Sequence, residues 1–110
     1  MSKVTQITDL QFEAEVIQSE QPVLVDFFAT WCPPCQRLAA ILEDLAVAYE
    51  GRIKFVKLNT DQEQQWAGKL SVRGLPTLAY FKGGEAMTVE GGLAPPNRIK
   101  EHLEKMLQSA

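Results

Sequence analysis

Two cysteines, Cys32 and Cys35, are the only thiols in this chain of 110 residues, and two prolines separate them. A thiolate is a nucleophile toward disulfides, and two thiols at this spacing can pair across one helical turn. Two cysteines are too few to hold a fold of this length together, so apolar burial must stabilise it. The pair therefore predicts thiol–disulfide exchange, in which one sulfur attacks a target disulfide and the second resolves the mixed disulfide.

The prolines predict different roles for the two sulfurs. A residue before proline avoids helical angles, so we expect Cys32 and Pro33 to be extended and Pro34 to open a helix. Cys32 then lies at the helix N-terminus, where free N–H groups and the macrodipole favour a thiolate. We expect a lowered pKa and solvent access for Cys32, and a shielded Cys35 that stays protonated longer. A structure that sealed Cys32 from solvent would contradict this interpretation.

Three simpler interpretations compete with exchange. A structural disulfide closing so small a loop stabilises little and would be reduced in the cytosol. A zinc half-site lacks a second cysteine pair, and His102 lies far along the chain. Two inert thiols are the third alternative. A strand-to-helix junction is where a redox Cys-x-x-Cys pair is expected, and this position favours exchange.

The charge and hydrophobicity of the chain argue against a nucleic-acid-binding or membrane-spanning protein. The net charge is −3, 45% of residues are hydrophobic and 23% are charged, with both signs interspersed. No basic patch suits nucleic acid or an anionic membrane, and no apolar run is long enough to span a bilayer. The first twenty residues lack the apolar core of a secretory signal. We therefore expect one cytoplasmic domain over residues 1–110, with no nucleic-acid or membrane partner. We also expect a monomer with no metal.

The apolar periodicity alternates between strand and helix along the chain. It predicts strands at residues 4–7, 23–29, 53–59, 77–82 and 86–90, and helices at 8–18, 34–49, before 69 and from 95 onward. The strand at 23–29 is almost entirely apolar, as in sheets covered on both faces. The order predicts an α/β fold with a central mixed sheet: parallel core strands, an antiparallel edge hairpin and helices on both faces.

Short motifs mark the ends of these elements. Thr8 with Gln11 matches a capping box, and Thr60 with Glu63 repeats the pattern before the third helix. Glycines at 83–84 predict the hairpin turn, and Gly51 follows the second helix. The last helix buries a face made of Ile99, Leu103, Met106 and Leu107. We expect His102 to be solvated, and Trp66 to lie in the core or be partly covered.

Asp26 is a carboxylate within the apolar strand at 23–29. Such a group is costly to bury unless it is paired or functional, and burial raises its pKa toward a range useful for proton transfer. The simpler alternative is a structural ion pair with Lys57, whose strand we expect nearby. The two interpretations are compatible, since Lys57 can tune Asp26.

Several motifs make the chain resemble the thioredoxin family over nearly its whole length: Val25-Asp26-Phe27, Ala29-x-Trp31-Cys32-x-Pro34-Cys35, Gly74-Leu75-Pro76-Thr77, Phe81-Lys82-x-Gly84 and Gly92. The resemblance implies the thioredoxin fold and a general protein-disulfide reductase. It also implies that Asp26 serves as acid and base for Cys35 through water. It implies no bound cofactor, disulfide-containing proteins as partners, and electrons from NADPH through a thioredoxin reductase.

The resemblance further implies a target-binding rim. It assigns a cis bond before Pro76, whereas the residues alone favour a trans proline that opens a strand. Leu75 would then offer its backbone to an extended target segment. The rim consists of Trp31, Pro33, Pro34, Leu75, Pro76, Gly92 and Leu93. For Trp31 the alternative is simple packing over the helix start.

Four residues depart from the family pattern: Pro33 for glycine, Phe28 for tryptophan, Gln36 for lysine and Ala40 for a helix-kinking proline. Gln36 removes a positive charge near Cys32, and without the proline we expect a straighter second helix. The prolines between the cysteines are also similar to those of periplasmic reductants. The rival functions are therefore an oxidase, isomerase or dedicated extracytoplasmic reductant on the same fold, and a binding subunit that needs no redox chemistry.

Overall fold

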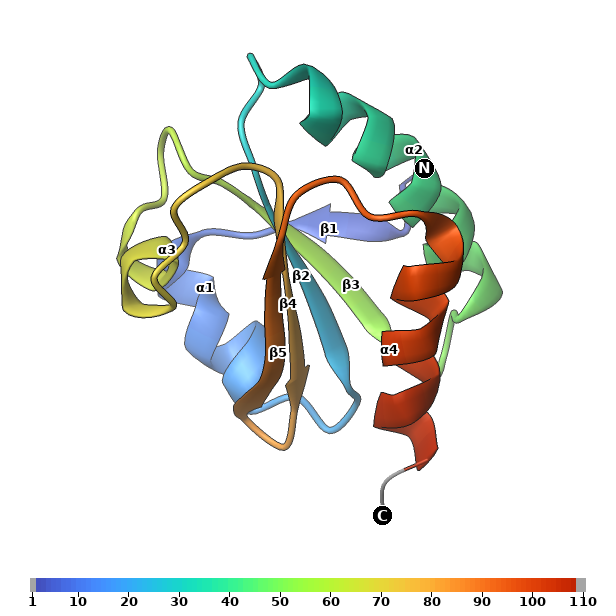
Figure 1. Cartoon of the computed structure of the whole chain (residues 1–110). Coiled ribbons are helices and arrows are strands. Elements are labelled where there is room, and N and C mark those ends of the chain that lie inside the picture. The colour runs from blue at the N-terminus through green and yellow to red at the C-terminus, as the bar shows by residue number, and fades with distance from the viewer. Residues whose placement is uncertain (1, 109–110) are drawn as a thin grey trace.

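The computed structural model describes residues 2–108, which fold around one five-stranded sheet (Figure 1). Its strands are β1 (Val4–Gln6), β2 (Val23–Phe28), β3 (Lys54–Asn59), β4 (Thr77–Lys82) and β5 (Glu85–Gly91). The spatial order is β1-β3-β2-β4-β5. β3 pairs parallel with β1 and β2, while β4 pairs antiparallel with β2 and β5. The predicted mixed sheet with an antiparallel edge hairpin is confirmed.

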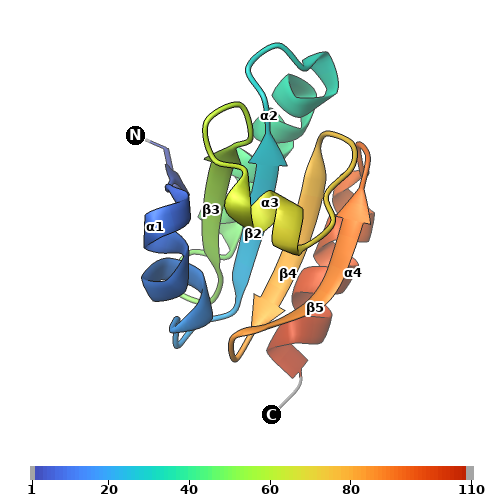
Figure 2. The ribbon, with the colours of Figure 1, turned by 90° about the vertical axis from the view of Figure 1, so that its left-hand side faces the viewer.

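Helices cover both faces of this sheet, as predicted. They are α1 (Asp9–Phe12), the π-helix η1 (Glu13–Ile17), α2 (Pro33–Ala48), α3 (Gln65–Lys69) and α4 (Pro96–Gln108). Figure 2 shows α1 and α3 in front of the strands and α2 and α4 behind them. The sheet is therefore the middle layer of three, which explains why β2 is apolar on both sides.

Strand alternation divides the core into two clusters. Leu24 and Leu78 face α2 and α4, where they join the buried side of those helices, including Leu42 and Leu103. The opposite side chains of β2, Val23, Val25 and Phe27, pack toward α1, η1 and α3. Burial on both faces fixes the register of β2, because a one-residue slip would exchange its two side-chain sets.

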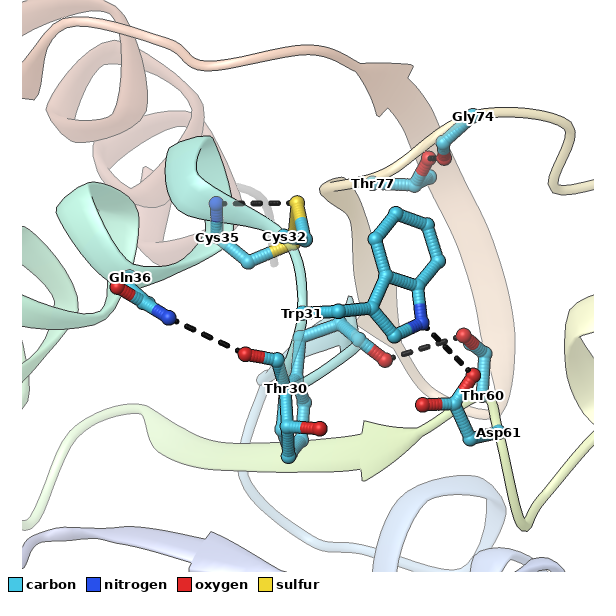
Figure 3. Close-up of a disulfide and its surroundings, with 10 residues drawn as sticks. Thr30, Trp31, Cys32, Cys35, Gln36, Thr60, Asp61, Gly74 and Thr77 are labelled. Carbon is cyan, nitrogen blue, oxygen red and sulfur yellow. Dashed lines mark hydrogen bonds between the residues drawn. A yellow bond between two sulfur atoms is a disulfide. The ribbon is translucent and has the colours of Figure 1, made fainter.

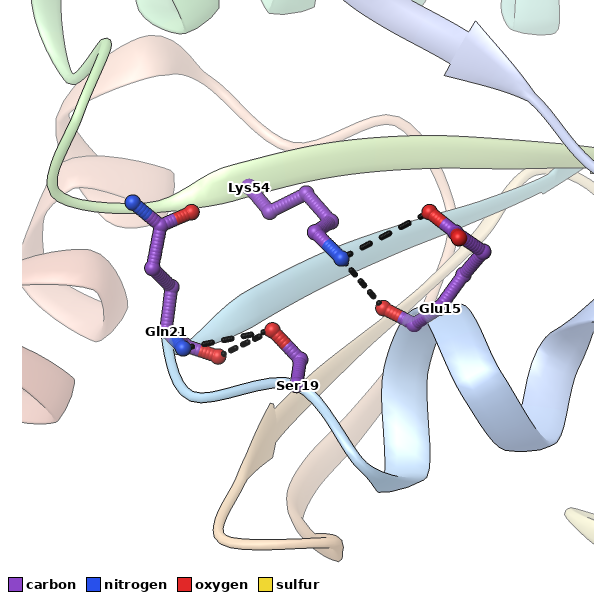
Figure 4. Close-up of polar contacts among 4 residues, drawn as sticks. All are labelled: Glu15, Ser19, Gln21 and Lys54. Atoms are coloured by element: carbon purple, nitrogen blue, oxygen red, sulfur yellow. Dashed lines mark hydrogen bonds and ion pairs between the residues drawn. The ribbon is translucent and has the colours of Figure 1, made fainter.

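Polar contacts tie the end of η1 to the sheet (Figure 4). The Lys54 ammonium of β3 donates to the Glu15 carbonyl at 2.8 Å and lies 3.6 Å from the Glu15 carboxylate. Between η1 and β2, the Ser19 hydroxyl donates to the Gln21 carbonyl at 2.9 Å and accepts from the Gln21 N–H at 3.2 Å. These bonds satisfy backbone groups at a chain reversal where no strand or helix supplies partners.

The single helix predicted at 8–18 is wrong in its second half. Gln11 does accept a hydrogen bond from the Thr8 N–H at 2.9 Å, as the capping-box pattern predicts. After α1, however, the chain continues as the π-helix η1, in which the Gln18 N–H donates to the Glu13 carbonyl, five residues earlier, at 2.9 Å. A π turn and an α turn bury similar apolar positions, so periodicity does not separate them.

The capping box predicted from Thr60 and Glu63 is also wrong. The Thr60 hydroxyl donates to the Phe28 carbonyl at 3.1 Å, and the Glu63 carboxylate accepts from the Asp9 N–H at 2.7 Å. The Asp9 carboxylate in turn accepts the backbone N–H groups of Gln65 and Trp66, at 3.0 and 3.2 Å. Helices α1 and α3 therefore cap each other, and the cap of α3 comes from a distant part of the sequence.

Two aromatic side chains test further predictions. Trp66 is partly buried and stacks on Phe12 with 4.1 Å between ring centroids, which confirms its expected place beside the core. His102 is not solvated as predicted: its ring lies 4.7 Å from that of Tyr80, and its side chain is 19% exposed. Tyr80 of β4 and Glu90 of β5 both lie against the ring, which leaves it only partly exposed.

Candidate active site

Cys32 and Cys35 form a disulfide at the junction between β2 and α2, with their Cα atoms 5.2 Å apart (Figure 3). The central strand β2 ends at Phe28, and α2 begins immediately after Cys32. The spacing of two residues thus brings the sulfurs together within one turn, as predicted. Both oxidised and reduced forms are accessible to such a pair.

Cys32 is the N-cap residue of α2. Its backbone is extended, with φ −99° and ψ 105°, and its Sγ accepts a hydrogen bond from the Cys35 N–H at 3.2 Å. A helix N-terminus presents unpaired N–H groups and the positive end of the macrodipole, and both stabilise a thiolate. The predicted position of this sulfur is confirmed.

The first helical residue is Pro33, one position earlier than predicted. Both Pro33 and Pro34 lie in the first turn, where the N–H that proline lacks has no intrahelical acceptor. The fixed φ of proline also suits this turn. These factors outweigh the tendency of the residue before Pro34 to be extended.

The predicted solvent access of Cys32 is not found in the disulfide form. Each cysteine is only 3% exposed, so exposure does not distinguish Cys32 from Cys35. The pair packs against Ala29, Phe28 and Leu75, which cover both sulfurs. A small exposed fraction remains, and the two sulfurs differ instead in their neighbours.

Cys35 shares a cavity of about 240 Å³ with Asp26. Asp26 is 2% exposed, and its Oδ1 has no hydrogen-bond partner among residues 2–108. A cavity of this size has room for several water molecules that could hydrogen-bond the carboxylate. Burial raises the pKa of Asp26 from 3.8 to about 7, while the positive charge of Lys57 acts in the opposite direction.

Lys57 lies beside Asp26 in the parallel ladder of β2 and β3 and lines the same cavity. The two side chains form no ion pair within 4.0 Å among those that the structure describes, so the alternative of a structural ion pair is not found. The Lys57 ammonium lies 5.4 Å from the centre of the Phe28 ring instead. Lys57 therefore acts on Asp26 as a nearby positive charge that lowers the pKa of its carboxyl.

Trp31 is 68% exposed and does not simply pack over the helix start. Its indole N–H donates to the Asp61 carboxylate at 3.1 Å (Figure 3). The Asp61 N–H donates to the Asn59 side chain at 3.0 Å. The Gln36 amide donates to the Thr30 carbonyl at 3.1 Å. Sequence reasoning missed Asp61, because only the fold brings the loop after β3 beside Trp31.

The Leu75–Pro76 peptide bond is cis, as the resemblance implied. Leu75 packs against the cysteine pair, and it lines a groove together with Trp31. The Gly92 N–H donates to the Pro76 carbonyl at 2.8 Å, which joins two parts of the predicted rim. Leu93 follows and is 43% exposed.

Comparisons with known proteins agree with this geometry. The Thioredoxin family model matches residues 3–105. Thioredoxin 1 of Nostoc sp. is 45% identical over 97% of this chain and 100% of its own length. The chain belongs to the thioredoxin family. Thioredoxin of Synechocystis sp. is 42% identical over the same shares, and a chloroplastic M-type thioredoxin of Pisum sativum is 41% identical over 97% of this chain and 62% of its own length.

Family membership and the paired cysteines establish this thioredoxin as a thiol–disulfide oxidoreductase. Thioredoxins carry out this chemistry without a prosthetic cofactor. Within residues 2–108, no three or more histidine, cysteine or acidic side chains gather where they could hold a metal ion. None of the helices in that range is long and apolar enough to cross a membrane.

Proposed function

We propose that this thioredoxin reduces disulfides of target proteins, with Cys32 as the nucleophile and Cys35 as the resolving thiol. The Cys32 thiolate attacks one target sulfur and releases the other as a thiolate. The Cys35 thiolate then attacks Cys32 in the mixed disulfide and releases the second target sulfur. Two electrons pass to the target, and the Cys32–Cys35 disulfide forms. The observation that carries this assignment is Cys32 at the N-cap of α2.

Asp26 is proposed to take the proton of Cys35 during resolution, through water in their common cavity. The support is the enclosed position of both groups and a carboxyl pKa of about 7, which suits proton transfer near neutral pH. Lys57, on the cavity wall, keeps that pKa from rising further.

Targets are proposed to bind at the rim around the disulfide. An extended segment would add to the backbone at Leu75, in the manner of a strand joining a sheet edge. The remaining rim residues are Trp31, Pro33, Pro34, Pro76, Gly92 and Leu93. Trp31 and Leu93 offer the exposed apolar surface that protein contacts favour.

We further propose that the protein acts as a monomer of one domain and receives electrons from NADPH through a thioredoxin reductase. The cytoplasm is the proposed compartment, because a chain with only this redox pair suits a reducing environment. The name of the Pisum sativum relative makes the plastid the alternative. Cell fractionation with an antibody to this protein would separate the two.

Trapping variants test the cysteine roles directly. Cys35→Ser should accumulate mixed disulfides with target proteins, while Cys32→Ser should form none. Equal trapping by both variants would overturn the assignment. Equilibration of the pair with a glutathione redox buffer tests the direction of transfer: a potential well above the cytosolic poise would favour the oxidase alternative. Unchanged function in cells after both substitutions would favour the redox-independent binding subunit.

A further inference from the structure

A group of polar side chains joins β5 to α4. The Arg98 guanidinium donates two hydrogen bonds to the two carboxylate oxygens of Glu90, each at 2.7 Å. His102 Nε2 lies 3.6 Å from the same carboxylate, and the His102 ring covers that of Tyr80. Arg98 and His102 are four positions apart on α4 and so share one face of the helix. We call Glu90, Arg98 and His102 the β5–α4 bridge.

The bridge spans the loop that carries part of the rim. Glu90 immediately precedes a pair of glycines, and Arg98 follows a pair of prolines at 95–96. Within the loop, Gly92 has a φ of +98° and Leu93 is 43% exposed. Gly91 is held in β5, but Gly92 lies in the loop, where glycine adopts many backbone conformations, so this loop needs contacts that select one of them.

We propose that the β5–α4 bridge positions this loop for target binding, so that Glu90 and Arg98 are positioning residues of the exchange reaction. This inference rests on the proposed role of the rim. The Gly92 N–H bonds to the Pro76 carbonyl at 2.8 Å, and this contact aligns the loop with the segment next to the disulfide. When the bridge is broken, Gly92 and the loop after it gain freedom, and a target must order the loop as it binds, which weakens affinity.

Geometry separates this bridge from an ordinary surface ion pair. The Glu90 side chain is only 22% exposed, although that of Arg98 is 56% exposed, and the hydrogen bonds between them are bidentate. Bidentate bonds to a carboxylate restrict orientation as well as distance. The Lys3–Glu50 pair is a natural control, because its side chains are 49% and 58% exposed and Glu50 lies beyond the far end of α2 from Cys32.

The test compares a protein disulfide with a small one. Glu90→Gln and Arg98→Ala are assayed with insulin as the protein target and with 5,5′-dithiobis(2-nitrobenzoate) as the small disulfide. Both variants should raise KM for insulin roughly threefold, a change in the range of a partly shielded ion pair. The kcat for insulin, the rate with the small disulfide and the redox potential should not change. Lys3→Ala should match the unmodified protein in every assay.

Three results would overturn the inference: an unchanged KM for insulin, an equal loss of rate with both disulfides, or the same rise in KM for Lys3→Ala. Leu93→Ser separates this inference from the proposed rim. If Leu93→Ser raises KM and the bridge variants do not, the rim stands and the bridge has no positioning role. If neither Leu93→Ser nor the bridge variants change KM, both proposals fail.

Discussion

Replacing Asp26 with asparagine should make the fold more stable, and increasingly so as pH rises. Asp26 is 2% exposed, and burial raises the pKa of its carboxyl from 3.8 to about 7. The folded state therefore binds this proton more tightly than the unfolded chain does. The contribution of Asp26 to the unfolding free energy should be highest below about pH 4, fall as the pH rises toward 7, and then level off.

The size of the effect follows from the two pKa values. The rise from 3.8 to about 7 is about 3 pKa units. At about 1.36 kcal/mol per unit, this corresponds to about 4 kcal/mol of stability lost between acid and alkaline pH. An asparagine amide stays neutral throughout, so its own cost of burial, about 1–3 kcal/mol, is the same at every pH. The difference between pH 8 and pH 4 therefore isolates the charge of Asp26.

Urea denaturation of the oxidised protein at a series of pH values measures this difference. The gap in unfolding free energy between Asp26→Asn and the unmodified protein should widen by about 4 kcal/mol from pH 4 to pH 8. Asp44→Asn is the matched control, since Asp44 is an exposed carboxylate on α2. Its profile should run parallel to that of the unmodified protein.

Parallel profiles for Asp26→Asn would refute the reasoning, because they would mean that the Asp26 carboxyl has the same pKa folded and unfolded. The same variant tests the proton transfer. Resolution by Cys35 should slow most above pH 7, where the native carboxylate is ionised and able to accept a proton. Stopped-flow reduction rates with the same pH dependence in both proteins would contradict that role.

Three further substitutions test the surrounding structure. Lys57→Met removes the charge that lowers the pKa of Asp26, so the carboxyl should titrate above about 7 in an NMR titration; an unchanged or lower midpoint would contradict this electrostatic assignment. Asp9→Ala removes the acceptor for two N–H groups of α3 and should cost about 1 kcal/mol of unfolding free energy, with faster amide exchange at 65–66; unchanged exchange would show that the cap is dispensable. Gly84→Ala should destabilise by about 1–3 kcal/mol in urea, because φ is +82° and the new Cβ would lie 3.0 Å from the Ile17 carbonyl oxygen. An unchanged urea midpoint would show that this turn adapts.

The sequence predicted the elements whose signals are local. The apolar pattern placed β4 at its observed bounds and β2 within one residue, because burial on both faces leaves a short, nearly continuous apolar run that is typical of a central strand. The cysteine pair predicted exchange, because both the spacing of the cysteines and the start of the helix depend only on residues 32–35. The starting residue of α2 was wrong by one position, since two prolines suit either its first or second place.

Tertiary structure decided the contacts between residues far apart in the chain. Asp9 caps a helix that begins 56 positions later, and Asp61 meets Trp31 across 30 positions. Local patterns carry no record of such partners, because many arrangements of the same elements satisfy the same periodicity. The fold also set the low exposure of Cys32 and the cavity that Asp26 shares with Cys35. The residue types determined which chemistry is possible, whereas burial and distance, which depend on packing of the whole sheet and its helices, determined the environment of each group.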